Sequence, residues 1–290
     1  FAAYVARENA IFTALDAEVT AKVTPAERTP LNRYYRQSLV WPGHFSPDAN
    51  RSFVLMPAGK PRGGVVLLHG LTDSPYSVRH LAENYQQHGF VAVVPRLPGH
   101  GTAPGALTDV DWEAWLAATR LAVREATRLT GNDLPLHLVG YSNGGALAMK
   151  YALDALDAPA LRQPEQIVLL SPMIGVTAFA RFAGFAGLPA MLPAFAKAAW
   201  LNISPEYNPY KYNSFPVNAA RQSWLLTQAL HEQINRGVHD HKLAQLPPIL
   251  AFQSVMDSTV STRAVVSGLF DQLPANGSEL VVFEDRKSVV

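Results

Sequence analysis

Residues 134–153 have the sequence LPLHLVGYSNGGALAMKYAL, in which an apolar run passes directly into a helical pattern. Ser142 stands at the junction, where Gly140-Tyr141-Ser142-Asn143-Gly144 matches the pattern G-x-S-x-G. A turn this sharp from strand to helix strains the backbone at the serine, and larger residues at positions 140 and 144 would collide with it. The stretch therefore predicts a nucleophilic hydroxyl raised at the carboxyl edge of a sheet. The alternative is a serine that only caps the helix N-terminus.

Short apolar runs elsewhere in the chain are typical of strands in a parallel sheet that is covered on both faces. From residue 52 onward they are SFVLMP, GGVVLLHG, FVAVVPR, LPLHLVG, EQIVLLSP, PPILAFQS and ELVVFED. Helical patterns separate most of them, at residues 75–88, 109–130, 143–157 and 258–273. Strands that alternate with helices predict right-handed crossovers and an α/β fold.

Three regions are expected from the pattern. Residues 1–50 begin with an amphipathic helix over residues 3–20 and continue as an extended arm interrupted by prolines. Residues 51–172 and 247–290 form the α/β core. The interval 173–246 is far longer than an ordinary connection, and its first part is apolar and interrupted by prolines. We interpret this interval as an inserted cap made of short helices.

Composition excludes several classes of function. The 290 residues carry a formal net charge of +1 without a basic block, so nothing indicates a nucleic-acid or anionic-membrane partner. No apolar run is long enough to span a bilayer. The absence of cysteine excludes disulfides, thiolate catalysis and Cys-ligated zinc. The chain begins with Phe1 rather than Met, which we interpret as trimming, and both a cytoplasmic and an exported location remain open.

Four motifs occur in order between residue 60 and the end of the chain: LLHGLTDSPYS, PRLPGHG, LVGYSNGG and AFQSVMDSTV. With these motifs the chain resembles bacterial serine hydrolases of the α/β-hydrolase fold, near the carboxylesterases and monoacylglycerol-lipase-like enzymes. The resemblance implies a mostly parallel sheet flanked by helices, an inserted helical cap, and cofactor-free hydrolysis of a small-molecule carboxylic ester. Peptidase or amidase chemistry remains open, because the same catalytic groups serve both, and so does a non-catalytic binding protein of this fold.

The resemblance also implies where the oxyanion hole lies. In similar enzymes the loop after the HG-containing strand supplies one backbone amide, which here is the N–H of Leu71. The second is the N–H of Asn143, directly after the nucleophile. Two fixed amides aimed at a developing alkoxide lower the barrier by a few kcal/mol. His69 is interpreted as structural, and His100 as a hydrogen-bonding residue of the tight GHG turn.

The acidic member of a catalytic triad is expected just after a later strand. Asp257 follows the strand PPILAFQS and precedes a predicted helix, so it is placed to orient an imidazole. The alternative is that Asp257 caps the helix that begins near Ser258. Asp240 and Asp271 are poorer candidates, since one lies in a polar cap segment and the other late in a helix.

The sequence offers no clear candidate for the third member of the triad, the histidine base. In this fold the triad runs Ser, Asp, His along the chain, yet no histidine occurs from residue 242 to 290. His231, His239 and His241 could reach the serine only through an unusual fold of the cap. Lys287 would need strong desolvation to lose its proton. We expect the catalytic histidine beyond Val290.

Two further patterns have competing interpretations. His239-Asp240-His241 could suggest a metal site, but two histidines without a third ligand favour a solvated loop, and we expect no metal. Aromatic residues in the first part of the cap, Phe182 and Phe195 among them, are either core or the wall of an acyl pocket. We assign Phe182 and Phe195 to substrate binding as a hypothesis.

Overall fold

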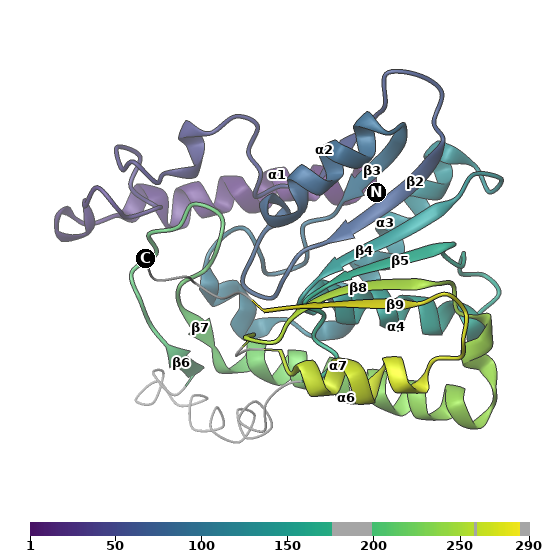
Figure 1. The fold of residues 1–290 in the computed structure, drawn as a ribbon. Helices are drawn as coiled ribbons and strands as arrows, with labels where there is room; N and C mark the ends of the chain where they lie inside the picture. Colours follow the sequence, from purple (N-terminus) through teal and green to yellow (C-terminus); the bar gives the residue numbers. More distant parts are fainter. Residues whose placement is uncertain (176–198, 258–259, 285–290) are drawn as a thin grey trace, which may run out of the picture.

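A seven-stranded sheet organises the protein, as the computed structural model shows for residues 1–175, 199–257 and 260–284 (Figure 1). In spatial order the strands are β1 (Phe53–Leu55), β3 (Phe90–Val94), β2 (Gly63–Leu68), β4 (Leu136–Tyr141), β5 (Gln166–Leu170), β8 (Ile249–Ser254) and β9 (Glu279–Phe283). All neighbours are parallel except β1, which pairs antiparallel with β3. Each of the seven apolar runs therefore forms a strand, and the α/β class is confirmed.

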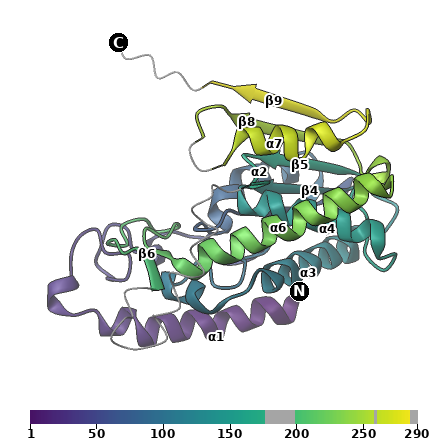
Figure 2. The same cartoon turned by 90° about the horizontal axis from the view of Figure 1, so that it is seen from below.

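Helices cover both faces of this sheet. One face carries α2 (Arg79–Gln87), and the other carries α3 (Trp112–Thr130), α4 (Asn143–Asp157), α6 (Val217–His239) and α7 (Thr262–Gly268) (Figures 1 and 2). α1 (Ala2–Glu18) lies beside α3 (Figure 2). The short 3-10 helices and the small hairpin are η1 (Thr20–Lys22), η2 (Pro25–Glu27), η3 (Pro42–His44), η4 (Pro75–Val78), η5 (Pro104–Asp109), β6 (Trp200–Asn202), β7 (Phe215–Pro216), η8 (Lys242–Gln245) and η9 (Phe270–Gln272).

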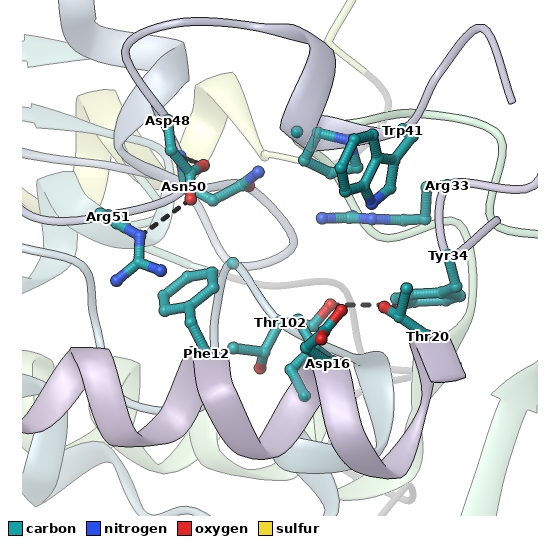
Figure 3. Close-up of a pocket in the computed structure, with 14 residues that line it drawn as sticks. Phe12, Asp16, Thr20, Arg33, Tyr34, Trp41, Asp48, Asn50, Arg51 and Thr102 are labelled. Carbon is teal, nitrogen blue, oxygen red and sulfur yellow. Dashed lines mark hydrogen bonds and ion pairs between the residues drawn. The ribbon is translucent and has the colours of Figure 1, made fainter. Parts of the chain in front are cut away.

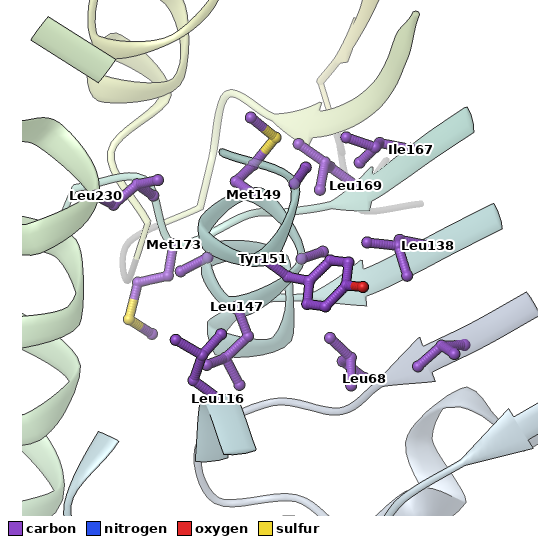
Figure 4. Packing of buried hydrophobic residues seen from close by; sticks show 14 of the residues in the cluster. Leu68, Leu116, Leu138, Leu147, Met149, Tyr151, Ile167, Leu169, Met173 and Leu230 are labelled. Atoms are coloured by element: carbon purple, nitrogen blue, oxygen red, sulfur yellow. The ribbon is translucent and has the colours of Figure 1, made fainter. Parts of the chain in front are cut away.

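The alternation of side chains along the strands divides the core in two. On β2, Val66 and Leu68 face α3 and α4, whereas Val65 and Leu67 face α2, and all four are fully buried. Figure 4 shows α4 lying between the sheet and α6, with its Leu147 and Met149 among the packed apolar residues. The helix that follows Ser142 is thus enclosed on nearly every side.

The interval 173–246 differs from the expectation of short helices. Its described part contains α6, a single helix of 23 residues, because residues 217–239 include no proline to interrupt it. Leu226, Leu230 and Ile234 of α6 join the same apolar core as α4. The latter half of the interval therefore packs on the core, while Phe182 and Phe195 lie outside the described residues.

The N-terminal helix forms as predicted, but its expected apolar stripe is wrong. The one buried residue of α1 is Glu8, whereas Ile11 is exposed. Glu8 pairs with the buried Arg96 at 3.1 Å and accepts hydrogen bonds from the Ser52 backbone N–H and hydroxyl. Buried polar groups thus attach α1 to the chain that follows β3.

Candidate active site

The turn at Ser142 has the strained geometry that its sequence predicts. Ser142 has φ +54° and ψ −115°, a combination that L-residues rarely adopt. A Cβ on Gly140 would lie 2.4 Å from the carbonyl oxygen of Gly144, and a Cβ on Gly144 would lie 2.2 Å from that of Leu68. Gly140 is therefore required because the start of α4 folds back against it, and Gly144 is required because the turn packs on the end of β2.

The hydroxyl of Ser142 does not serve the helix. Ser142 occupies the N-cap position of α4, but within the described structure its side chain makes no capping hydrogen bond. Its backbone is held instead, since its N–H donates to Leu170 O at 2.9 Å and its carbonyl accepts from Met173 N–H at 3.0 Å. The capping interpretation is therefore wrong, and the hydroxyl is left available.

Two backbone amides lie beside this turn without a protein acceptor. Leu71 follows the end of β2, and Asn143 begins α4. Within the described residues, neither N–H donates a hydrogen bond to the protein. Amides in this state are ready to receive an anion.

Two buried histidines support the loop that contains Leu71. His69 accepts from Leu97 N–H through Nε2 at 3.0 Å, and its Nδ1 lies 2.9 Å from Gly70 O. The Nε2 of His100 lies 2.5 Å from Leu71 O, and its Nδ1 lies 3.0 Å from Pro98 O. Both rings thus contact backbone groups, which agrees with the prediction that His69 and His100 hold the surrounding loops in place.

Burial keeps these two rings neutral. Burial is the largest cause that lowers the pKa of His69 well below its usual value, and the neighbouring His100 adds to it. Burial also lowers the pKa of His100 to about 4, against the opposing effect of its contacts with the carbonyl oxygens of Pro98 and Leu71. A neutral ring carries one N–H, and we assign that of His100 to Nε2 because its contact with Leu71 O is the shorter.

Residues 211–212, which precede α6, also contact the loop that contains Leu71. Tyr212 N–H donates to Thr72 O at 2.8 Å, and the Tyr212 hydroxyl donates to Gly99 O at 2.9 Å. Lys211 Nζ lies 3.8 Å from Asp73, whose carboxyl pKa is raised by burial and lowered in part by that lysine. Residues 211–212 therefore fix the positions of residues 72–73.

Asp257 lies at the same edge of the sheet, where the strands β2, β4, β5 and β8 end. Burial raises the pKa of Tyr141, and the negative charges of Asp73 and Asp257 raise it further. The predicted helix begins later than expected, at Thr262, and Ser261 is its N-cap through a 3.2 Å bond from Ala264 N–H. Asp257 accepts a hydrogen bond from Val260 N–H through Oδ1 at 2.9 Å, so its carboxylate contacts the chain just before α7 but does not cap that helix.

All nine histidines lie in the described part of the chain, and none hydrogen-bonds to Ser142 there. His231 contacts Ile174 O through Nε2 at 2.6 Å. His239 is exposed and pairs with Asp240 at 2.9 Å, on the surface. The turn, the Leu71 and Asn143 amides and Asp257 thus lie at one edge of the sheet, and among the described residues the imidazoles nearest to them, His69 and His100, contact the backbone rather than Ser142.

Sequence reasoning missed two contacts of this site. Ser223 on α6 donates to the Asn143 side-chain oxygen at 3.2 Å, so α6 contacts the residue directly after Ser142. Tyr212 reaches the loop after β3 across 110 positions of sequence. Neither residue stands in a motif that predicts these partners.

Two kinds of feature are absent from the described part of the chain. No group of three or more His, Asp or Glu side chains there could hold a metal ion. None of the helices there is long and apolar enough to cross a membrane.

The parallel sheet, its helical layers and the serine turn after β4 define an α/β-hydrolase fold of the serine hydrolase class. The chain matches the Hydrolase_4 family, described as "Serine aminopeptidase, S33", over residues 59–285, and it belongs to that family.

Three relatives show how far the similarity extends. A thermostable monoacylglycerol lipase of Bacillus sp. (strain H-257) is 36% identical over 90 residues, which are 31% of this chain and 34% of that protein. The matched segment thus spans about a third of that relative. A structure from work on LipS and LipT, two metagenome-derived lipolytic enzymes, has a TM-score of 0.62 at 22% identity and covers 82% of this chain and 88% of that one. The monoacylglycerol lipase of Paleococcus ferrophilus has a TM-score of 0.59 at 18% identity, with 81% and 88% covered.

Proposed function

We propose that the intact protein hydrolyses carboxylic esters with short- to medium-chain or lipid-like acyl groups through an acyl-enzyme on Ser142. The observation that carries the proposal is the strained turn at Ser142, whose hydroxyl makes no capping bond to α4 and whose next residue, Asn143, has an N–H without a protein acceptor in the described structure. The lipase named among the relatives supports an ester substrate.

The chemistry follows from the positions of these groups. Ser142 Oγ attacks the ester carbonyl carbon while a base takes its proton, and the carbonyl oxygen becomes an anion. The N–H groups of Leu71 and Asn143 stabilise that anion. Collapse expels the alcohol, which receives the proton, and water then releases the acid by the same steps. Neither a metal ion nor an organic cofactor is required.

The base in this proposal is a histidine outside residues 1–290, oriented by Asp257. The proposal is supported by the positions of the nine histidines, of which none hydrogen-bonds to Ser142 in the described structure. Sequencing the parent reading frame tests it, because a stop codon directly after Val290 would contradict it and favour a non-catalytic binding protein. A chain ending at Val290 is expected to show below about a thousandth of the intact activity, as for loss of a triad member.

Ester turnover tests the main proposal. Ser142→Ala in the intact protein should abolish hydrolysis of p-nitrophenyl butyrate and labelling by a fluorophosphonate, with an unchanged circular dichroism spectrum. Wild-type turnover in this variant would refute the assignment. The family description favours one alternative, an amide-cleaving enzyme. Faster turnover of aminoacyl p-nitroanilides than of esters would support that alternative.

A further inference from the structure

A cavity of about 160 Å³ lies between α1, the arm of residues 33–51, and Gly101–Thr102 (Figure 3). We call it the Arg33 cavity. It has room for on the order of ten non-hydrogen atoms, at 10–15 Å³ for each water-sized position. Phe12, Leu15, Trp41 and Pro42 give it apolar walls. The cavity therefore suits a small molecule with an apolar body.

Arg33 is the unusual residue of this cavity. Its side chain extends into the middle, between Trp41 and Tyr34 (Figure 3), and the residue is 1% exposed. Its Nε is buried without a hydrogen-bond partner in the described structure, and its Nη1 makes only a 3.5 Å contact with Lys211 O. A buried guanidinium usually has a carboxylate or phosphate partner, because burial of an unpaired charge is costly.

The acidic residues of the cavity are already paired elsewhere. Asp16 accepts two bonds from Arg36 at 2.6 Å, and Asp48 pairs with Arg51 at 2.9 Å. No ion pair of Arg33 occurs among the described residues; its guanidinium carbon lies 5.6 Å and 5.7 Å from the ring centroids of Tyr34 and Tyr212. When Arg36 is counted with the lining residues, three arginines stand against two carboxylates, and the arginine without a carboxylate partner among the described residues is the buried Arg33.

We propose that the Arg33 cavity binds a small monoanionic carboxylate with a short apolar body. The carboxylate pairs with the Arg33 guanidinium, and the apolar body lies against Phe12 and Trp41. The carboxylates of Asp16 and Asp48 at the same cavity repel a doubly charged phosphate more strongly, which favours a single negative charge. This site is distinct from Ser142 and does not depend on the esterase proposal.

Calorimetric titration of the intact protein with hexanoate, 1-hexanol and inorganic phosphate tests the site at pH 8, where the phosphate is mostly doubly charged. Hexanoate should bind at least about tenfold more tightly than the other two, and Arg33→Met should weaken it by at least about tenfold. Two controls should stay within about threefold: Arg7→Met, which removes an exposed charge from α1, and Ser142→Ala, which alters the catalytic turn.

The results of this titration distinguish hexanoate binding at the Arg33 cavity from hexanoate binding elsewhere, such as in an acyl pocket. Hexanoate affinity that survives Arg33→Met, equal affinity for 1-hexanol, or no binding of hexanoate would each overturn the proposal. Should Arg33→Met fail to fold, nuclear Overhauser effects in the wild type decide the question. Effects between the hexanoate methylene protons and the Trp41 indole support the site, and bound hexanoate without them overturns it.

Discussion

His100 Nε2 lies 2.5 Å from the carbonyl oxygen of Leu71. The His100 ring, from the loop after β3, therefore fixes the Leu71–Thr72 peptide, which is adjacent to the one that carries the Leu71 N–H. If that N–H stabilises the oxyanion, a shift of the loop should slow turnover. His100→Leu in the intact protein is expected to lower kcat by about 10²-fold with a smaller change in KM. His100→Gln, whose amide can donate from a similar position, should recover part of the loss. Equal kcat in His100→Leu and wild type would rule out this role.

The pKa of His100 predicts a pH-dependent stability. Because the folded pKa is about 4 against 6.5 for a free imidazole, the unfolded chain binds more protons between these values. The contribution of the neutral ring is complete above pH 6.5 and is lost as the pH falls toward 4, about 3 kcal/mol in all. Urea unfolding between pH 7 and 4 should show this decline, and His100→Gln should make it shallower while the contribution of the buried His69 remains. An identical dependence of the unfolding free energy on pH in the variant would contradict the lowered pKa of His100.

Because the turn at Ser142 packs on β2, adding one methyl group at Gly144 is expected to lower the stability of the protein strongly. A Cβ at Gly144 would lie 2.2 Å from Leu68 O, which is backbone and cannot rotate away. Gly144→Ala should reduce the free energy of unfolding by about 3 kcal/mol or more. Gly59→Ala is the matched control, because nothing lies within 4 Å of a Cβ there. Equal denaturation midpoints for the two variants would show that the turn can move.

The buried ion pair of α1 predicts a strong dependence on Glu8. Removing one partner leaves Arg96 buried without its charge partner, so Glu8→Ala should cost about 3–5 kcal/mol. Glu18→Ala on the same helix removes an exposed pair with Lys22 and should cost less than about 1 kcal/mol. Chemical denaturation followed by circular dichroism measures both. Similar values would mean that α1 is not attached through Glu8.

Phe182 and Phe195 remain a prediction from sequence, since they lie outside the described residues. If they line an acyl pocket, Phe182→Ala or Phe195→Ala should change the preference among p-nitrophenyl ester chain lengths more than the melting temperature. An unchanged preference together with a large loss of stability would assign them to the core.

Local patterns were enough to predict much of this structure. The seven strands are continuous apolar runs, and the turn at Ser142 is specified by glycines that stand within three residues of it in the sequence. Contacts between distant residues were not predictable in this way. Glu8 and Arg96 are 88 positions apart, and a lone glutamate on a helix gives no sign of a buried partner. The same holds for α6, whose residues 217–239 were expected to form short helices and whose contact with Asn143 no motif indicated.

The last strand, β9, has one neighbour, β8, among the described strands. Val281 and Phe283 share one face of β9 and are 41% and 48% exposed. Backbone groups without a strand partner in the described structure, beside exposed apolar side chains, form a template on which a second copy can add its own strand. We therefore expect a chain of residues 1–290 to self-associate at high concentration through this edge. A lysine at position 281 should keep it monomeric in light scattering, because strand addition would then bring like charges together.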